Sequence, residues 1–157
     1  MGRSPRSFVP DGIYHLTVHG IDDRPIFIDD TDRQSFVARL LRVIRTYRWA
    51  IWAACLMDTH YHLVLQPTLG VVSDGMRLVN GGHSRAFNKR HGRRGALFES
   101  RFTERTIRDE GHLAAAVAYV HYNPVTAGMV EDPAAWPWST HPGCDLYRVL
   151  RPYLKGV

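Results

Sequence analysis

Two spacings of apolar side chains divide the first part of the chain into a strand and a helix. Over residues 12–19 polar and apolar side chains alternate, with His15, Thr17 and His19 on one side of the alternation. This two-residue period is typical of a strand with one buried face. Over residues 31–47 apolar side chains recur at helical spacing, directly after an acidic segment that offers N-cap chemistry. The sequence therefore predicts a strand followed by a helix.

The middle of the chain contains two short apolar runs. Residues 49–57 and 60–66 are rich in apolar and aromatic side chains, and Asp58-Thr59 lies between them. Runs of this length with a polar break are typical of two strands joined by a turn.

The second half of the chain predicts two more helices and one more strand. A helix is expected over residues 73–90, although Gly81-Gly82 weakens its middle. An irregular alternation over 97–107 indicates a strand. The last long helix is expected over residues 109–122, and Pro124 should end it at or near the preceding residue.

The order of these elements predicts a fold class. Strands and helices follow one another as β-α-β-β-α-β-α, which is typical of a ferredoxin-like (RRM-like) α+β fold. We expect an antiparallel sheet with helices packed mainly on one face. No linker or repeat interrupts the chain, so residues 1–157 are interpreted as a single domain. Residues 124–157, with further prolines and Trp136-Pro137-Trp138, are interpreted as a packed C-terminal tail.

Composition narrows the class of protein. A chain of 157 residues with 45% hydrophobic residues is the size of one domain and can bury a core, which excludes wholesale disorder. No apolar run approaches the roughly 18 residues of a membrane span, and the first ten residues lack the apolar stretch of a secretion signal. Two cysteines are too few for a disulfide scaffold or a cysteine zinc site. We expect a cytoplasmic protein that does not bind membranes.

The positive charge of the chain is concentrated in one segment. The formal net charge is +5, whereas residues 85–108 hold eight Lys or Arg against two Glu and so carry +6. A basic segment in a chain that is otherwise near neutral favours a polyanionic partner. The alternative is a solvated surface without a ligand.

His60-Tyr61-His62 is the most distinctive local pattern. Because strand side chains alternate, His60 and His62 should share one face while Tyr61 points to the other. Two imidazoles on one face of a rigid strand can bind a divalent metal ion, although so short a pattern also arises by chance.

A second pattern is found near the end of the last long helix. Tyr119 and Asn123 are four residues apart, so they should lie one above the other on the same helix face. Asn123 could then supply an amide oxygen as a third metal ligand, beside the Tyr119 hydroxyl. The alternative is a tyrosine in the core and an asparagine that caps the helix.

These features, taken in order, resemble a known family. The chain is similar to the IS200-like Y1 transposases, and more closely to the REP-associated tyrosine transposases, of the HUH endonuclease superfamily. The matching elements are Tyr14-His15, Ile26-Phe27, Met57 with His60-Tyr61-His62-Leu63, Phe87-Asn88-Lys89-Arg90-His91-Gly92, Gly95 to Phe102, Tyr119 to Val125 with Ala127-Gly128, and Pro137-Trp138-Ser139. The chain differs from the family pattern in having Asp58-Thr59 where Pro-Asn is usual, and His19 where Arg is usual.

The resemblance implies an activity and roles for particular residues. His60, His62 and Asn123 would hold Mg²⁺ or Mn²⁺ against a phosphodiester of single-stranded or hairpin DNA. Tyr119 would attack the phosphorus and form a 5′-phosphotyrosine, as in DNA transposition. His15 is either a DNA contact, a support for the site or an ordinary half-buried histidine.

The resemblance also gives the basic segment a partner. Seven of its side chains are expected to contact DNA phosphates: Arg85, Lys89, Arg90, Arg93, Arg94, Arg101 and Arg105.

Two other functions are alternatives to a transposase. One is a catalytically silent nucleic-acid-binding protein on the same fold, and the other is an unrelated metal-dependent hydrolase. The protein could act as a monomer or as a homodimer.

Overall fold

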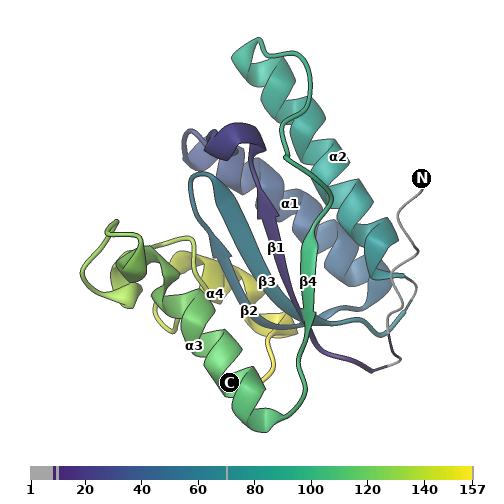
Figure 1. Cartoon of the computed structure of the whole chain (residues 1–157), viewed down its shortest axis with the longest axis vertical. Coiled ribbons are helices and arrows are strands. Elements are labelled where there is room, and N and C mark those ends of the chain that lie inside the picture. Colours follow the sequence, from purple (N-terminus) through teal and green to yellow (C-terminus); the bar gives the residue numbers. More distant parts are fainter. Residues whose placement is uncertain (1–8, 10, 70, 157) are drawn as a thin grey trace.

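The computed structural model describes residues 9, 11–69 and 71–156. Four strands and four α-helices make up most of the fold in this part of the chain (Figure 1). They are β1 (Tyr14–His19), α1 (Asp30–Tyr47), β2 (Ala50–Leu56), β3 (His60–Gln66), α2 (Val72–His91), β4 (Thr103–Thr106), α3 (Glu110–Thr126) and α4 (Asp145–Leu150). Short 3₁₀ turns cover Ile21–Asp23, Pro133–Ala135 and Arg151–Tyr153.

The strands form one antiparallel sheet in the order β2-β3-β1-β4. The predicted sequence of elements and the ferredoxin-like α+β class are therefore confirmed. Within the described residues, no helix is both long and apolar enough to cross a membrane.

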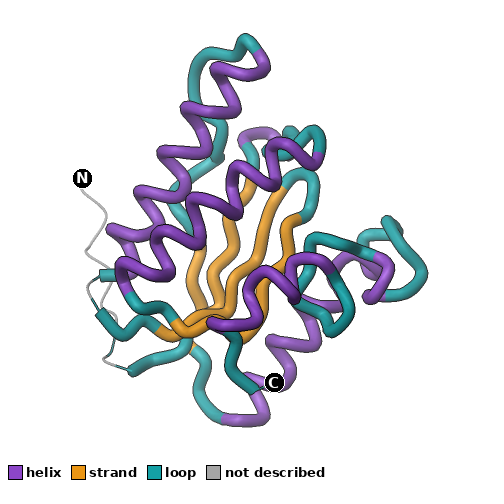
Figure 2. The backbone as a smooth tube through the Cα atoms, turned by 180° about the vertical axis from the view of Figure 1, so that it is seen from behind, coloured by secondary structure: helices purple, strands orange, loops and turns teal. Residues whose placement is uncertain are grey.

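The two faces of the sheet carry different side chains. On one face the apolar residues of β1 and β3, among them Leu16 and Leu63, join the main core with α1 and α2. On the other face Ala53, Cys55 and Val64 form a smaller core with α3. In Figure 1 α1 lies behind the sheet, and Figure 2 shows that helix layer from behind. The part of the second face that α3 leaves uncovered is where the polar residues of β1 and β3 lie.

The weakness expected at Gly81-Gly82 does not interrupt α2, which is continuous. A Cβ atom at Gly82 would lie 2.9 Å from Nε of Arg39 in α1, so glycine gives the Arg39 side chain the space it occupies. The need for glycine is greater near the start of α2. A Cβ at Gly75 would lie 2.4 Å from the ring of Trp49, so glycine there permits the close packing of α2.

The predicted end of the last long helix is wrong. Pro124 lies buried inside α3, and the helix continues to Thr126. Proline removes one backbone donor, but the Ala127 amide donates to Asn123 O and the Met129 amide donates to Pro124 O, both at 2.9 Å. These bonds close the final turn.

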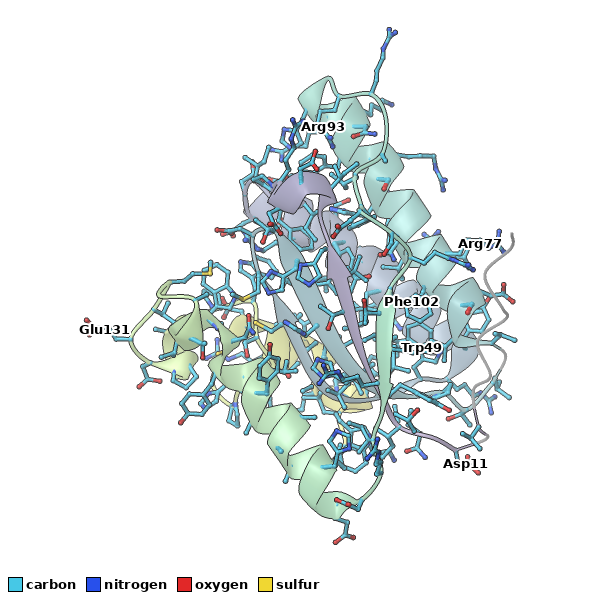
Figure 3. The ribbon with its side chains drawn as sticks, in the orientation of Figure 1. Asp11, Trp49, Arg77, Arg93, Phe102 and Glu131 are labelled. Atoms are coloured by element: carbon cyan, nitrogen blue, oxygen red, sulfur yellow. The ribbon has the colours of Figure 1, made fainter. Side chains whose placement is uncertain are left out.

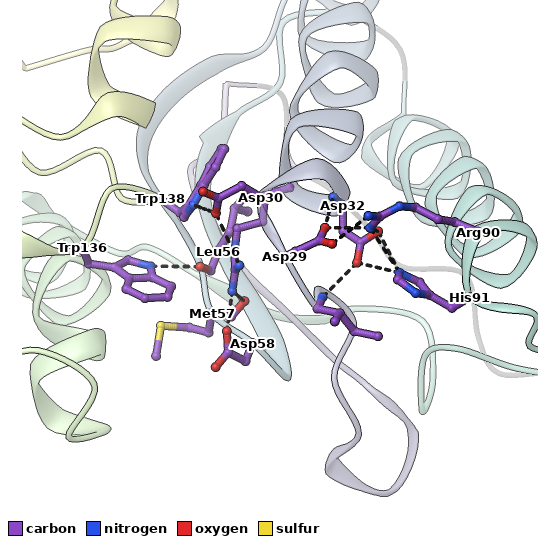
Figure 4. Close-up of polar contacts among 12 residues, drawn as sticks. Asp29, Asp30, Asp32, Leu56, Met57, Asp58, Arg90, His91, Trp136 and Trp138 are labelled. Atoms are coloured by element: carbon purple, nitrogen blue, oxygen red, sulfur yellow. Dashed lines mark hydrogen bonds and ion pairs between the residues drawn. The ribbon is translucent and has the colours of Figure 1, made fainter.

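A polar network joins the start of α1 to the end of α2 (Figure 4). Arg90 donates to Asp29 at 2.6 and 2.7 Å and to Asp32 at 2.8 Å, and His91 Nε2 lies 2.9 Å from Asp32. The Asp32 carboxylate also accepts from the backbone amide of Ile28 at 2.9 Å. Arg90 holds the pKa of Asp29 down at about 2.

The same region connects to the turn between β2 and β3. The buried Arg33 guanidinium donates to Met57 O at 3.1 Å and pairs with Asp58. The Trp136 indole donates to Leu56 O at 3.0 Å, and that of Trp138 donates to Asp30 at 2.8 Å (Figure 4). The segment that leads to His60 is thus held by α1 and by the C-terminal tail.

The tail also covers the outer edge of β2. Thr140 accepts from the Ala54 amide at 2.8 Å, and the Lys155 amide donates to Ile51 O at 2.8 Å. Contacts of this kind satisfy backbone groups that an edge strand would otherwise expose.

Candidate active site

A cavity of about 570 Å³ opens on the sheet face where β1 and β3 present polar side chains. It is bounded by β4 on one side and by α3 on the other. Of the described residues that line it, Arg105 is the one with a permanent positive charge, and none is a carboxylate. The lining consists of His15, Thr17, His19, His60, His62, Thr103, Arg105, His112, Ala115, Ala116 and Tyr119.

The cavity brings together residues that are far apart in the sequence. His60 and His62 lie on the same face of β3, while Tyr61 is buried on the other, as the alternation predicts. His60 Nε2 lies 3.2 Å from Asn123 Oδ1 of α3. The rings of His62 and Tyr119 meet edge to face, with centroids 5.6 Å apart. The juxtaposition of these four side chains follows from α3 packing on β2 and β3.

Each motif histidine is held through its Nδ1 atom. His60 Nδ1 lies 3.1 Å from Thr59 Oγ1, one of the residues at which the chain departs from the family pattern. His62 Nδ1 lies 3.0 Å from His15 Nε2 and 3.2 Å from Thr17 Oγ1. His62 Nε2 is buried and has no hydrogen-bond partner among the described residues.

His19 is a further site residue that sequence reasoning did not select. Its ring stacks on that of His60, with centroids 4.9 Å apart and an interplanar angle of 16°. The alternation over residues 12–19 places His15, Thr17 and His19 on one face, but it does not show how that face pairs with β3.

Burial favours the neutral form of the imidazoles. Burial lowers the pKa of His62 to about 3, with further lowering from His15 and His60. Burial also lowers the pKa of His60, although its hydrogen bond with Asn123 opposes the change. The pKa of His15 is lowered by burial and then by Arg105. Neutral imidazoles retain a lone pair that can bind a metal ion.

The donor atoms fit a divalent cation. The unpartnered His62 Nε2 could supply one nitrogen, and His60 Nε2, which donates to Asn123 Oδ1 at 3.2 Å, could supply a second nitrogen beside that amide oxygen once a cation takes the place of the shared proton. In the described part of the chain, no group of three or more His, Cys, Asp or Glu side chains is arranged to hold a metal ion. The candidate site is therefore a mixed histidine and amide set.

The two tyrosines of α3 occupy different surroundings. Tyr119 is 54% exposed and lines the cavity with the histidines. Tyr122 is equally exposed but lines a second cavity, of about 560 Å³, together with His121. Residues three apart on this helix therefore do not share a site.

The basic residues fall into separate groups. Arg105 of β4 lines the cavity, and Arg101 lies in a groove with Phe98 and Phe102. The other five lie on the second half of α2 or in the loop that follows it, where Figure 3 labels Arg93. Arg77, also labelled, lies near the start of the same helix. Of the seven predicted phosphate contacts, five are exposed and form no ion pair with another described residue: Arg85, Lys89, Arg94, Arg101 and Arg105.

Two of the predicted phosphate contacts are engaged within the protein. Arg90 pairs with Asp29 and Asp32, as described above. Arg93 donates to Asn88 Oδ1 and to Ala96 O, each at 3.3 Å. Arg90 thus joins the end of α2 to the start of α1, and Arg93 joins that end of α2 to the following loop.

Comparison with known proteins identifies the family. The family model described as "Transposase IS200 like" matches residues 8–123, which is most of the chain. The chain belongs to the IS200-like transposase family. This confirms the resemblance seen in the sequence.

Individual relatives agree with this assignment. A candidate REP-associated tyrosine transposase of Haemophilus influenzae Rd is 27% identical over 151 residues, covering 89% of this chain and 85% of the relative. The solved structure of a REP-associated tyrosine transposase bound to a REP hairpin has a TM-score of 0.77 at 24% identity, covering 98% of this chain and 88% of that one. A candidate transposase of Deinococcus radiodurans R1 has a TM-score of 0.50 at 17% identity, covering 78% of this chain and 97% of that one. At these identities the two structures show that this chain shares their fold.

Proposed function

We propose that this IS200-like transposase is an endonuclease and strand transferase for single-stranded or hairpin DNA, with Tyr119 as its nucleophile. One observation carries the proposal. Tyr119 lines the same cavity as His60 and His62, and Asn123 lies against His60. An exposed tyrosine hydroxyl beside neutral metal-binding groups suits attack on a phosphodiester.

The reaction follows from the chemistry of the phenol. Tyr119 Oη attacks the phosphorus in line, and the P–O3′ bond breaks. The products are a 5′-phosphotyrosine and a free 3′-OH, which receives a proton as Tyr119 loses its own. Because the phosphodiester energy is kept in the new bond, a 3′-OH can reverse the step and join strands without ATP.

His60, His62 and Asn123 are the residues that would hold Mg²⁺ or Mn²⁺. When bound, the metal ion supplies Lewis-acid stabilisation of charge on the phosphate oxygens. As the Tyr119 hydroxyl attacks, it must lose its proton to a group in the complex. The chain holds Tyr119 beside His62 and His15, whose rings lie 5.6 and 5.8 Å from the tyrosine ring.

Positive charge at the cavity and on α2 favours a nucleic acid. Arg105 lines the cavity. The exposed Arg85, Lys89 and Arg94 do not line it and lie along the end of α2 and the following loop. A relative that shares this fold over nearly the whole chain was solved bound to a REP hairpin. A hairpin with a single-stranded flank is therefore the partner that we propose for this chain.

Cleavage of labelled hairpin oligonucleotides tests the proposal. With Mn²⁺ the wild-type protein should release a fragment with a free 3′-OH and retain the other fragment covalently, and EDTA should abolish both products. His62→Ala should abolish cleavage while leaving hairpin binding largely intact. Full cleavage in EDTA would contradict the metal set. Tight hairpin binding without cleavage under any metal would instead identify a silent binding protein.

A further inference from the structure

We propose that His15 and Thr17 are positioning residues for His62: together they hold its Nδ1 atom, so that Nε2 stays available in the cavity. The inference deepens the proposed function and rests on it, because it explains how one of the proposed metal ligands is oriented. It concerns two residues of β1 that make no contribution to the proposed ligand set themselves.

The sheet register brings the three side chains together. Thr17 pairs directly with His62 across β1 and β3, and His15 is two residues away on the same face. Cross-strand neighbours on one face lie close enough for their side chains to bond. His62 Nδ1 accordingly lies 3.0 Å from His15 Nε2 and 3.2 Å from Thr17 Oγ1. The His62 side chain is nearly inaccessible, so these contacts are made away from bulk water.

The hydrogen-bond inventory favours one tautomer of His62. A neutral imidazole has one N–H group and one lone pair. His62 Nδ1 has two possible acceptors, whereas Nε2 has no partner among the described residues. A proton on Nε2 would be a buried donor with nothing to donate to, which proteins rarely tolerate. The Nδ1–H tautomer satisfies the donor and leaves the Nε2 lone pair for a ligand.

The arrangement matches a general feature of metal sites. A ligating histidine usually donates its other N–H group to a neighbouring acceptor, which fixes both its tautomer and its ring orientation. His15 Nε2 can accept only if His15 carries its own proton on Nδ1. Thr17 Oγ1 can accept in any case. The two residues are thus complementary acceptors for the same proton.

The tautomer of His62 in the metal-free protein is the first test. Long-range ¹⁵N–¹H correlation spectra distinguish the two tautomers, with His62→Gln used to assign the signals. The wild-type protein should contain the Nδ1–H form of His62. Finding the Nε2–H form would overturn the proposal, whatever the outcome of any cleavage assay.

Mn²⁺ affinity is the second test, measured on the protein without DNA. The double variant His15→Leu/Thr17→Val removes both acceptors and should weaken Mn²⁺ binding by about 10- to 100-fold. His15→Gln with Thr17→Ser restores acceptors and should recover most of the affinity. His112→Phe removes another imidazole of the same cavity that does not contact His62, so it should leave both the tautomer and the affinity nearly unchanged.

Failures of the two proposals are distinguishable. An affinity that is unchanged in a folded double variant would overturn the positioning role. If wild-type protein bound no Mn²⁺, the proposed metal set would fail, while the tautomer spectrum would still decide whether His15 and Thr17 orient His62. If the double variant failed to fold, the wild-type spectrum would still report the tautomer of His62. The single variants His15→Leu and Thr17→Val would then replace the double variant in the measurement of Mn²⁺ affinity, and unchanged affinity in both would overturn the positioning role.

Discussion

Replacement of Asp32 by alanine should destabilise the fold strongly, because this buried carboxylate joins two helices. The Asp32 side chain is 2% exposed and accepts from Ile28 N, Arg90 Nη1 and His91 Nε2 at 2.8–2.9 Å. It therefore connects the start of α1 to the end of α2. Asp32→Ala removes all three contacts at once.

The magnitude follows from these contacts. A hydrogen bond to a charged group contributes about 1.5–3 kcal/mol. Arg90 keeps its two bonds to Asp29, so the loss of Asp32 does not leave its guanidinium unpaired. The loss of stability is therefore smaller than the sum of three bonds. We expect the free energy of unfolding to fall by about 2–4 kcal/mol. In a domain of this size each kcal/mol lowers Tm by about 2–4 °C.

Urea unfolding followed by tryptophan fluorescence measures this loss. Asp74→Ala is a matched control, because Asp74 is also in the first turn of a helix and pairs with Arg77 at 3.7 Å, but its side chain is 54% exposed. The control should lose less than about 1 kcal/mol. Equal losses in the two variants would refute the reasoning from buried contacts.

Three further outcomes are expected. Arg90 depresses the pKa of Asp29 from 3.8 to about 2, so this carboxylate stabilises the fold above about pH 4 and its contribution should disappear as the pH falls towards 2. The free energy of unfolding of Asp29→Asn should therefore depend less on pH over this range than that of the wild type, and an unchanged dependence would contradict the pairing. Arg85→Ala/Arg94→Ala should reduce the log–log salt slope of single-strand binding by about 0.7 per lost contact, whereas an unchanged slope would mean that both side chains face solvent. Asn123→Ala should cleave DNA better than His62→Ala and be restored by excess Mn²⁺, since a neutral amide is more easily replaced by water than an imidazole; the reverse order would contradict the ligand set.

Much of the fold could be predicted because local patterns dominate it. The apolar run 60–66 matches β3, and the alternation over 12–19 contains β1 with its polar face correctly identified. The order of strands and helices then indicated the sheet. Local rules were less reliable inside the helices: Pro124 does not end α3, which continues to Thr126, and Gly81-Gly82 does not interrupt α2.

The candidate site was only partly predictable. The strand period and the helix spacing each indicated one pair of residues, His60 with His62 and Tyr119 with Asn123, and the resemblance joined them. The contact between His15 and His62 depends on the β1–β3 register, which no single segment encodes. Likewise the pairing of Arg90 with Asp29 spans 61 residues, so the sequence showed only a cation in a basic segment.

The central claim is that Tyr119 is the nucleophile. The control is Tyr122→Phe, which changes an equally exposed tyrosine of the same helix at a different cavity. Both variants remove one hydroxyl from a half-exposed tyrosine, so each should fold and bind hairpin DNA as the wild type does.

The most direct test is peptide mapping of the covalent protein–DNA adduct by mass spectrometry after reaction with a hairpin oligonucleotide and Mn²⁺. We predict that the wild type and Tyr122→Phe carry the nucleotide on Tyr119, and that Tyr119→Phe forms no adduct. An adduct on any other residue, or one that persists in Tyr119→Phe, would contradict the account.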